Sequence, residues 1–224
     1  MPSRAQLISA VALRMDEITP SAGLTVSVDG SDNNPLATLI DGIVDDGVLE
    51  LFSVAPYWRL PQTAFLEVNT LISTENGRKY IRLKLGEDFL RVAEISCPDF
   101  QRPITEVVTE LSPMGKRQHN RYLMAKEAKP VGVMSHGIFD NTQVREIDCY
   151  SLSPDSTVTT DDVVASYIAK PAAIASTGTS AVEAVVPPVL IPALEWLIAA
   201  RAFGARGDAD HAGICQQNAQ NLMV

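Results

Sequence analysis

The stretch from Pro187 to Val224 carries the longest uninterrupted helical pattern of this 224-residue chain, and it constrains the fold more than any other feature. Its first half places strong hydrophobes at spacings of three and four, which align on one face of an α-helix. These residues are Leu190, Ile191, Leu194, Leu197 and Ile198. Pro187 and Pro188 suit a first helical turn, and Gly204 and Gly207 are predicted to break or bend the helix. The apolar face must be buried, so the rest of the chain has to supply a second apolar surface.

The second half of this stretch, Asp208 to Met223, is predicted to form another helix with few strong hydrophobes. Those hydrophobes are Ile214, Cys215, Leu222 and Met223, and glutamine and asparagine are frequent between them. We therefore expect this helix to be half solvated or buried against a partner.

Two further helices are predicted near the N-terminus. Ser3 can cap the first, which should end at Pro20. Its apolar positions follow the helical period and are Leu7, Ile8, Val11, Met15 and Ile18. Asn34 before Pro35 is typical of a helix start, and this second helix should end near Pro56. Its buried side is marked by Leu36, Leu39, Ile40, Ile43 and Leu51.

The middle of the chain favours strands. Asn76-Gly77, between the extended runs Phe65 to Ser73 and Tyr80 to Leu85, predicts a β-hairpin. Further extended segments are expected at Leu90 to Ser96, Ile104 to Leu111, Val131 to Ser135, Val144 to Leu152 and Thr157 to Ala169. Ser112-Pro113 should start a short polar helix that reaches about Ala125.

The order of helices, strands and helices indicates an α+β fold rather than an alternating parallel one. We expect residues 1–60 and 187–224 to form one helical bundle. Residues 61–170 should form an inserted, mainly antiparallel β lobe with one short helix. Residues 171–186, rich in Ala, Ser, Thr and Val, are interpreted as a linker.

The net charge of −9 argues against a protein that holds nucleic acid by neutralising its phosphates. It does not exclude a conduit, whose acidic surface would repel the DNA that passes it. The basic run Lys116 to Arg121 is interpreted as pairing with acids of the same or a neighbouring subunit.

Cys97, Cys149 and Cys215 are odd in number and far apart, so we interpret them as small buried hydrophobes rather than disulfide or zinc ligands. The N-terminus lacks the features of a secretory signal, and no run approaches eighteen apolar residues. A soluble protein made in a cytoplasm, without a membrane partner, is therefore expected.

Few residues suggest catalysis. His119 lies in a polar run and His211 on the last predicted helix, where solvated side chains are the simpler interpretation. Ser135 and His136 are adjacent, but neighbours in an extended chain point to opposite faces and the nucleophile-elbow pattern is absent. We expect no enzyme activity.

Acidic residues offer one candidate metal site. Asp41, Asp45 and Asp46 have a helical spacing that could hold a hard cation, although solvated charge is the simpler interpretation. No phosphate-binding glycine loop or dinucleotide fingerprint occurs, so no cofactor and no metal is expected.

A series of short motifs resembles a known family. Gly86 to Leu90 leads into a strand and then Arg102-Pro103-Ile104, followed by a polar helix that closes on Asn120-Arg121-Tyr122. Lys129 to Gly132 and a strand around Tyr150 to Pro154 complete the series. Set between N- and C-terminal helices, it resembles the head-to-tail connector (adaptor or ring) proteins of tailed bacteriophages, most of all those of crAss-like phages. The Leu24 to Asn34 insertion and the Ala/Ser/Thr linker depart from that pattern.

The resemblance implies a structural virion protein at the head–tail junction, assembled in the host cytoplasm. Its copies would form a ring, usually twelvefold, that contacts the portal and other tail or ring proteins while double-stranded DNA passes through. A closed ring needs two different patches on each subunit. Our candidate interface residues are Leu7, Val11, Arg14, Trp196, Arg201, Phe203, His211, Gln216 and Leu222.

Within this hypothesis, Leu190 to Phe203 closes the bundle and Asp208 to Val224 docks on a neighbouring subunit. Deletion of Ala209 to Val224 should then leave a folded subunit. Two alternatives remain: another tail or minor capsid component, such as a tail-tube or tail-terminator protein, and a small enzyme or ligand-binding module that uses the β lobe.

Overall fold

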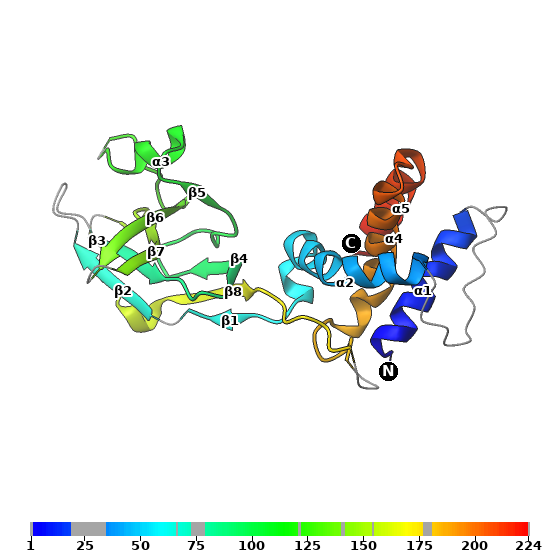
Figure 1. Cartoon of the computed structure of the whole chain (residues 1–224). Coiled ribbons are helices and arrows are strands. Elements are labelled where there is room, and N and C mark those ends of the chain that lie inside the picture. Colours follow the sequence, from blue (N-terminus) through cyan, green and yellow to red (C-terminus); the bar gives the residue numbers. More distant parts are fainter. Residues whose placement is uncertain are drawn as a thin grey trace. The chain divides into compact units, whose positions relative to one another are not determined.

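The computed structural model describes residues 2–18, 35–65, 67–72, 79–120, 122–139, 142–153, 155–176 and 181–223. The chain divides into two compact units, shown in Figure 1. Met1–Pro61 and Lys170–Val224 form the helical unit, and Gln62–Ala169 form the β unit. The predicted α+β class is confirmed: helices from both ends of the chain pack together, and mostly antiparallel strands lie between them in sequence.

The helical unit is built around its fourth helix. Its elements are α1 (Arg4–Ile18), α2 (Pro35–Val54), η1 (Tyr57–Arg59), η3 (Pro188–Leu190), α4 (Ile191–Ala205) and α5 (Ala209–Met223). α4 packs against α1, α2 and α5. Its buried residues extend around more than one face, which is typical of a central helix: Ile191, Ala193, Leu194, Leu197, Ile198, Ala199, Ala202 and Phe203.

The first two helices form where their apolar periods predict. Leu7, Val11 and Met15 of α1 are buried, as are Ile40 and Leu51 of α2. The predicted Leu24 to Asn34 insertion lies outside the described residues.

α5 completes the helical bundle. Its Cys215, Ala219 and Met223 are buried, and the helix packs along α4 of its own unit. This packing confirms the predicted bundle of N- and C-terminal helices. Docking of α5 on a neighbouring subunit stays a prediction. The other face of α5 still exposes Ile214 and Leu222.

The segment interpreted as a linker contributes to the helical core. Ile174, Val182 and Val186 are buried. The Ile174 amide donates to the Asp45 carboxylate over 3.0 Å, and its carbonyl oxygen accepts a hydrogen bond of 2.8 Å from Arg4 Nη1. These bonds fix the returning chain to α1 and α2.

The segment Pro188–Ala205 is long and apolar enough, with a mean hydropathy of 1.3, to cross a membrane by length and composition. The expectation that no run approaches eighteen apolar residues stands, because Glu195 and Arg201 interrupt this segment with charge. In the structure the segment is η3 and α4, whose apolar side chains are buried against the other helices of the unit.

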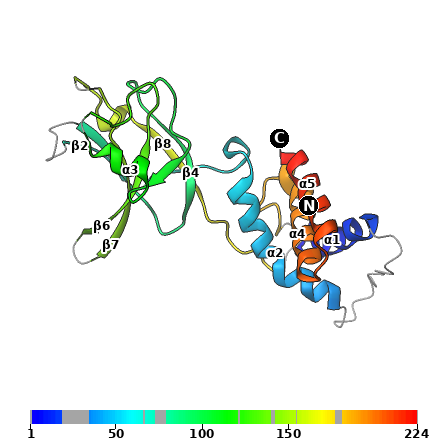
Figure 2. The ribbon, with the colours of Figure 1, turned by 90° about the horizontal axis from the view of Figure 1, so that it is seen from above.

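The β unit contains two sheets. One has the order β1 (Thr63–Ala64), β8 (Val164–Ala169) and β4 (Phe89–Ser96). The other has the order β2 (Glu67–Ile72), β3 (Lys79–Lys84), β7 (Thr142–Cys149), β6 (Gly132–Phe139) and β5 (Val107–Thr109). Among the described pairings β5–β6 is parallel and the rest are antiparallel. Figure 2 shows β6 and β7 extending side by side beyond their sheet.

The predicted hairpin is confirmed, because β2 and β3 pair from Glu67↔Lys84 to Ile72↔Lys79. Its predicted Asn76-Gly77 turn lies outside the described residues. Ile81 and Leu83 of β3 are buried in one hydrophobic core with residues of the other sheet, such as Ile95 and Tyr167. The two sheets therefore share a single core.

Several predicted elements of the β unit have different bounds. The short helix α3 (Pro113–Gln118) ends earlier than Ala125, and the buried Gln118 side chain joins a backbone group inside the helix to one beyond its end. Its Oε1 accepts from the Ala125 amide over 2.9 Å, and its Nε2 donates to the Met114 carbonyl over 3.1 Å. Strand β7 ends at Cys149, so the expected strand around Tyr150 is irregular, and a 3-10 turn, η2 (Thr160–Asp162), precedes β8.

Candidate functional site

A polar hollow of about 250 Å³ lies on the β unit. Its lining comes from β3, β6, β7 and the residues on either side of α3: Arg82, Glu110, His119, Val133, Ser135, Glu146, Asp148 and Tyr150. Charged groups of both signs meet here around a buried carboxylate, which makes the hollow the most polar concave feature among the described pockets.

An ion pair organises this hollow. The Arg82 guanidinium donates to both carboxylate oxygens of Asp148 over 2.8 Å, and its Nη1 lies 3.1 Å from Glu146 Oε2. The Tyr150 hydroxyl donates to Asp148 Oδ2 over 3.2 Å. The hydrogen bonds that Arg82 donates to Asp148 raise the pKa of Arg82, and burial beside the Asp148 charge raises the pKa of Tyr150. Both groups therefore remain protonated donors.

Aromatic rings brace the same network. The Tyr80 and Tyr150 rings stack with centroids 5.1 Å apart, and the Arg82 guanidinium lies 5.5 Å from the Tyr80 centroid. The centroids of the His119 and Tyr150 rings are 5.4 Å apart. The planar groups hold one another in place, so the network is rigid.

The hollow brings together three residue types found in hydrolases: Ser135 as a candidate nucleophile, His119 as a base and Glu110 as an acid. Their geometry does not suit nucleophilic catalysis. The His119 Nε2 to Glu110 Oε1 distance is 3.9 Å, longer than a hydrogen bond, and Ser135 lies within β6 opposite Glu146 rather than on a sharp turn. The side chain of His136 lies outside the described residues.

The candidate cation site on α2 is taken by arginines. Arg4 Nε lies 2.6 Å from Asp41 Oδ1, and its Nη1 lies 3.2 Å from Asp45 Oδ1. Arg201 Nη1 lies 3.8 Å from Asp46 Oδ2. Among the described residues no group of three or more His, Cys, Asp or Glu side chains could hold a metal ion. No sequence signal points to Arg4, which lies 37 positions from Asp41.

Three of the predicted interface residues belong to the subunit's own core. Leu7, Val11 and Phe203 are buried in the helical unit, so assigning them to a contact with another chain was wrong. An apolar helical period has the same appearance whether it faces its own chain or a partner. Arg14 and Trp196 also meet within the unit, with the guanidinium 5.2 Å from the indole centroid.

The other four predicted interface residues are less enclosed. Arg201 Nε donates to Glu50 Oε2 over 2.6 Å at the exposed side of α2 and α4. His211 Nδ1 lies 2.6 Å from Asp208 Oδ2 at the start of α5. Gln216 lines a pocket, and Leu222 is exposed. Their role at an interface stays a prediction.

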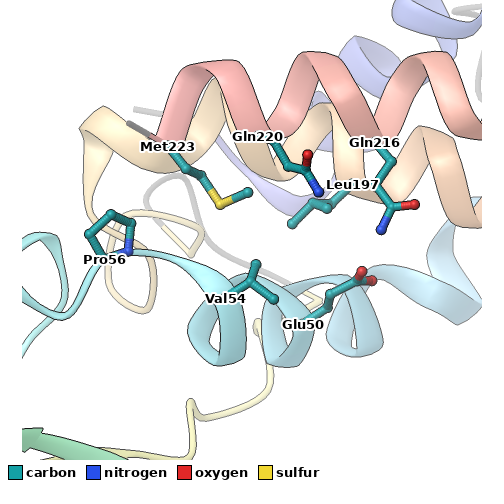
Figure 3. A pocket seen from close by; sticks show the side chains of 7 residues that line it. All are labelled: Glu50, Val54, Pro56, Leu197, Gln216, Gln220 and Met223. Atoms are coloured by element: carbon teal, nitrogen blue, oxygen red, sulfur yellow. The ribbon is translucent and has the colours of Figure 1, made fainter. Parts of the chain in front are cut away.

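That pocket is a second hollow, of about 280 Å³, in the helical unit. Figure 3 shows its lining, which comes mainly from α2 and α5: Glu50, Val54, Pro56, Leu197, Gln216, Gln220 and Met223. Apolar groups form most of its wall, with the Glu50 carboxylate on one side and the two glutamine amides on the other. A partner surface that presents an apolar side chain surrounded by polar groups would fit it.

No protein-family model matches the chain, and a search of the curated proteins found no match. The geometry of the two units and the resemblance described above therefore carry the functional argument.

Proposed function

We propose that this chain is a structural virion protein that forms an oligomeric ring between portal and tail in a tailed bacteriophage. The ring would contribute part of the channel through which double-stranded DNA passes. The observation that carries this proposal is the architecture: helices from both ends of the chain form one unit, and a β unit is inserted between them. That order of elements is the one the resemblance implies.

Exposed apolar side chains support an oligomer. Large hydrophobes are exposed on α1, α2 and α5 of the helical unit: Leu13, Leu49, Val54, Ile214 and Leu222. A ring subunit needs two unlike patches, one for each neighbour, and apolar residues on different helices can supply them.

The charge of the helical unit suits a channel wall. It carries twelve acidic and six basic side chains, a net charge of −6. An acidic wall repels the phosphate backbone, so DNA can pass without being retained.

The test is the assembly state of the purified chain, measured by mass photometry and negative-stain electron microscopy. We expect closed rings, and we expect them to bind purified portal protein. A chain that stays monomeric at high concentration and does not bind portal would contradict the proposal. A cryo-EM map of the particle would separate this assignment from a tail-tube, tail-terminator or minor capsid component, because the proposed ring must touch the portal.

The polar hollow of the β unit favours a second candidate, a small enzyme or ligand-binding module. Its strongest residues are His119 and Ser135. If an activity is detected, the double replacement of His119 and Ser135 by alanine should abolish it under this second candidate. An activity that survives the replacement would remove the hollow as its source.

A further inference from the structure

The residues around α3 expose an unusual number of large apolar side chains. We call residues 110–126 the α3 segment. Leu111 is 82% exposed, Tyr122 is 87% exposed and Leu123 is 60% exposed, and Met114 is also exposed. Exposed side chains of this size within one short segment make that segment a candidate interaction surface.

The α3 segment is held firmly on the β unit. The Ser112 hydroxyl caps α3 by accepting from the Gly115 amide over 3.0 Å. Gly115 lies so close to the Thr109 backbone that a side chain there would collide with it. The buried Gln118 closes the following turn, and Met124 is buried beside Tyr150. The exposed apolar groups are therefore displayed on a pre-ordered scaffold, which lowers the entropy cost of binding.

The α3 segment is also basic within an acidic chain. Its sequence contains Lys116, Arg117, Arg121 and Lys126 against one acid, Glu110. The whole chain has 18 basic and 27 acidic side chains. The segment therefore combines exposed apolar groups with positive charge, and its complement is a surface that combines apolar groups with negative charge.

The helical unit presents such a surface on α2. We call it the acidic face: Asp41, Asp45, Asp46, Leu49 and Val54. The two apolar residues are exposed, and the side chain of Asp46 is 66% exposed. With Glu50, four carboxylates face two guanidinium groups, those of Arg4 and Arg201, so negative charge is in excess.

The acidic face continues into the apolar hollow of Figure 3. Glu50 and Val54 belong to both α2 and the wall of that hollow, which Met223 of α5 also lines. A leucine or methionine side chain has the right size and character to enter a hollow of about 280 Å³. The acidic face thus offers both a charge complement and an apolar socket.

We propose that the α3 segment of one copy docks on the acidic face and apolar hollow of a second copy. The two surfaces are different, so the contact is heterologous and can repeat from subunit to subunit. Its closure into a ring rests on the proposed function. The opposite charges of the two surfaces favour this partner and speed its association. Burial of the exposed apolar residues then stabilises the contact.

The test compares charge variants by mass photometry at 50 mM and 500 mM NaCl, with circular dichroism as the folding check. Lys116→Glu combined with Arg117→Glu should weaken assembly and raise its apparent dissociation constant at least tenfold. Lys170→Glu combined with Arg206→Glu removes the same charge from exposed positions elsewhere and is the matched control. Adding Asp46→Arg to the α3 variant should restore part of the assembly.

A second variant probes the apolar part, since Tyr122→Ser with Leu123→Ser should weaken assembly at both salt concentrations. Rings that tolerate the α3 variants as well as the control would overturn this inference and leave the proposed function standing. Loss of portal binding without loss of rings would assign the segment to another partner and also overturn the inference. A wild-type chain without any oligomer would instead count against the proposed function itself.

Discussion

Arg82 and Asp148 form a two-point ion pair across neighbouring strands of the β unit. Arg82 Nε donates to Asp148 Oδ1 and Nη2 to Oδ2, each over 2.8 Å, and the two residues are direct register partners of β3 and β7. The Asp148 side chain is only 3% exposed. The same two residues therefore pair through the strand register and through their charges. The buried Asp148 carboxylate depends on Arg82 for its neutralising charge.

Replacing Arg82 by glutamine should therefore destabilise the β unit. The change leaves a buried carboxylate without its cation, which costs about 3–5 kcal/mol in fully buried pairs. Arg82 is about a third exposed, so we expect about 2 kcal/mol after solvent screening. Hydrogen exchange of peptides from β3 and β7 measures the loss.

The matched control is the triple variant Arg82→Met with Asp148→Leu and Glu146→Gln, which removes the charges of all three residues of the ion-pair network. We expect it to recover most of the protection, because apolar pairs often replace buried ion pairs at little cost. Equal protection in Arg82→Gln and the wild type would contradict the assigned role of the pair.

Residues with strong periodic patterns were predictable from the sequence. The buried stripes of α1, α2 and α4 follow helical spacing, and β3 alternates buried Ile81 and Leu83 with the more exposed Tyr80 and Arg82. Each pattern depends only on the local geometry of a helix or a strand, so it can be recognised without knowing which surface the element packs against.

Contacts between distant positions were not predictable. Arg82 and Asp148 are 66 positions apart, and Arg4 reaches Asp45 across 41 positions. Nothing in the spacing of single charges reveals such pairs. In α5 the sequence named Cys215 and Met223 as hydrophobes, but it gave no signal for the burial of Ala219, a small residue that adds little to an apolar stripe.

Two glycines of α2 should respond oppositely to alanine. A Cβ at Gly47 would lie 2.6 Å from Ile198 Cγ1, so Gly47→Ala should force α2 away from α4 and destabilise the unit by about 1–3 kcal/mol. Gly42 has open space around it, and Gly42→Ala should stabilise the helix by up to about 1 kcal/mol. Thermal unfolding followed by tryptophan fluorescence measures both, since Trp58 and Trp196 lie in the helical unit. Shifts of the same sign would contradict the close α2–α4 contact.

Asp208 should make the start of α5 sensitive to acid. Its carboxylate accepts from the His211 amide over 3.3 Å and lies 2.6 Å from His211 Nδ1. The hydrogen bond from the His211 side chain lowers the pKa of Asp208 below its usual 3.8. A lowered pKa in the folded state means that this stabilisation is complete above about pH 4 and is lost as the pH falls through the lowered value.

The corresponding measurement is the unfolding midpoint of the wild type and Asp208→Ala between pH 2 and pH 7. We expect a lower midpoint for the variant at pH 7 and a difference that shrinks below pH 4. Asp210→Ala, on the exposed first turn of the same helix, is the control. A difference that grows as the pH falls below 4 would refute the assignment.

The three thiols should be unreactive in the folded protein. Cys97, Cys149 and Cys215 are buried, and burial raises the pKa of each, that of Cys215 to about 11. Because the thiolate is the reactive form, a maleimide at pH 7.5 should label none of them within minutes and all three after denaturation. Mass spectrometry counts the labels, and rapid native labelling of Cys215 would contradict the packing of α5 on α4.

Deleting Ala209–Val224 should disrupt the helical unit itself. α5 buries Cys215, Ala219 and Met223 along α4, and the Leu222 carbonyl accepts a hydrogen bond of 3.2 Å from Arg59 Nη1. Without α5, the apolar face of α4 that it covers would be open to water, which costs about 25 cal/mol for each Å² of apolar area. We expect the truncated chain to lose more helical circular dichroism than the 15 residues of α5 account for, and to aggregate. The control Ile214→Ser changes the exposed face of α5 and should keep the fold. A truncated chain that keeps the helicity of α1, α2 and α4 would show that α5 serves assembly rather than the core.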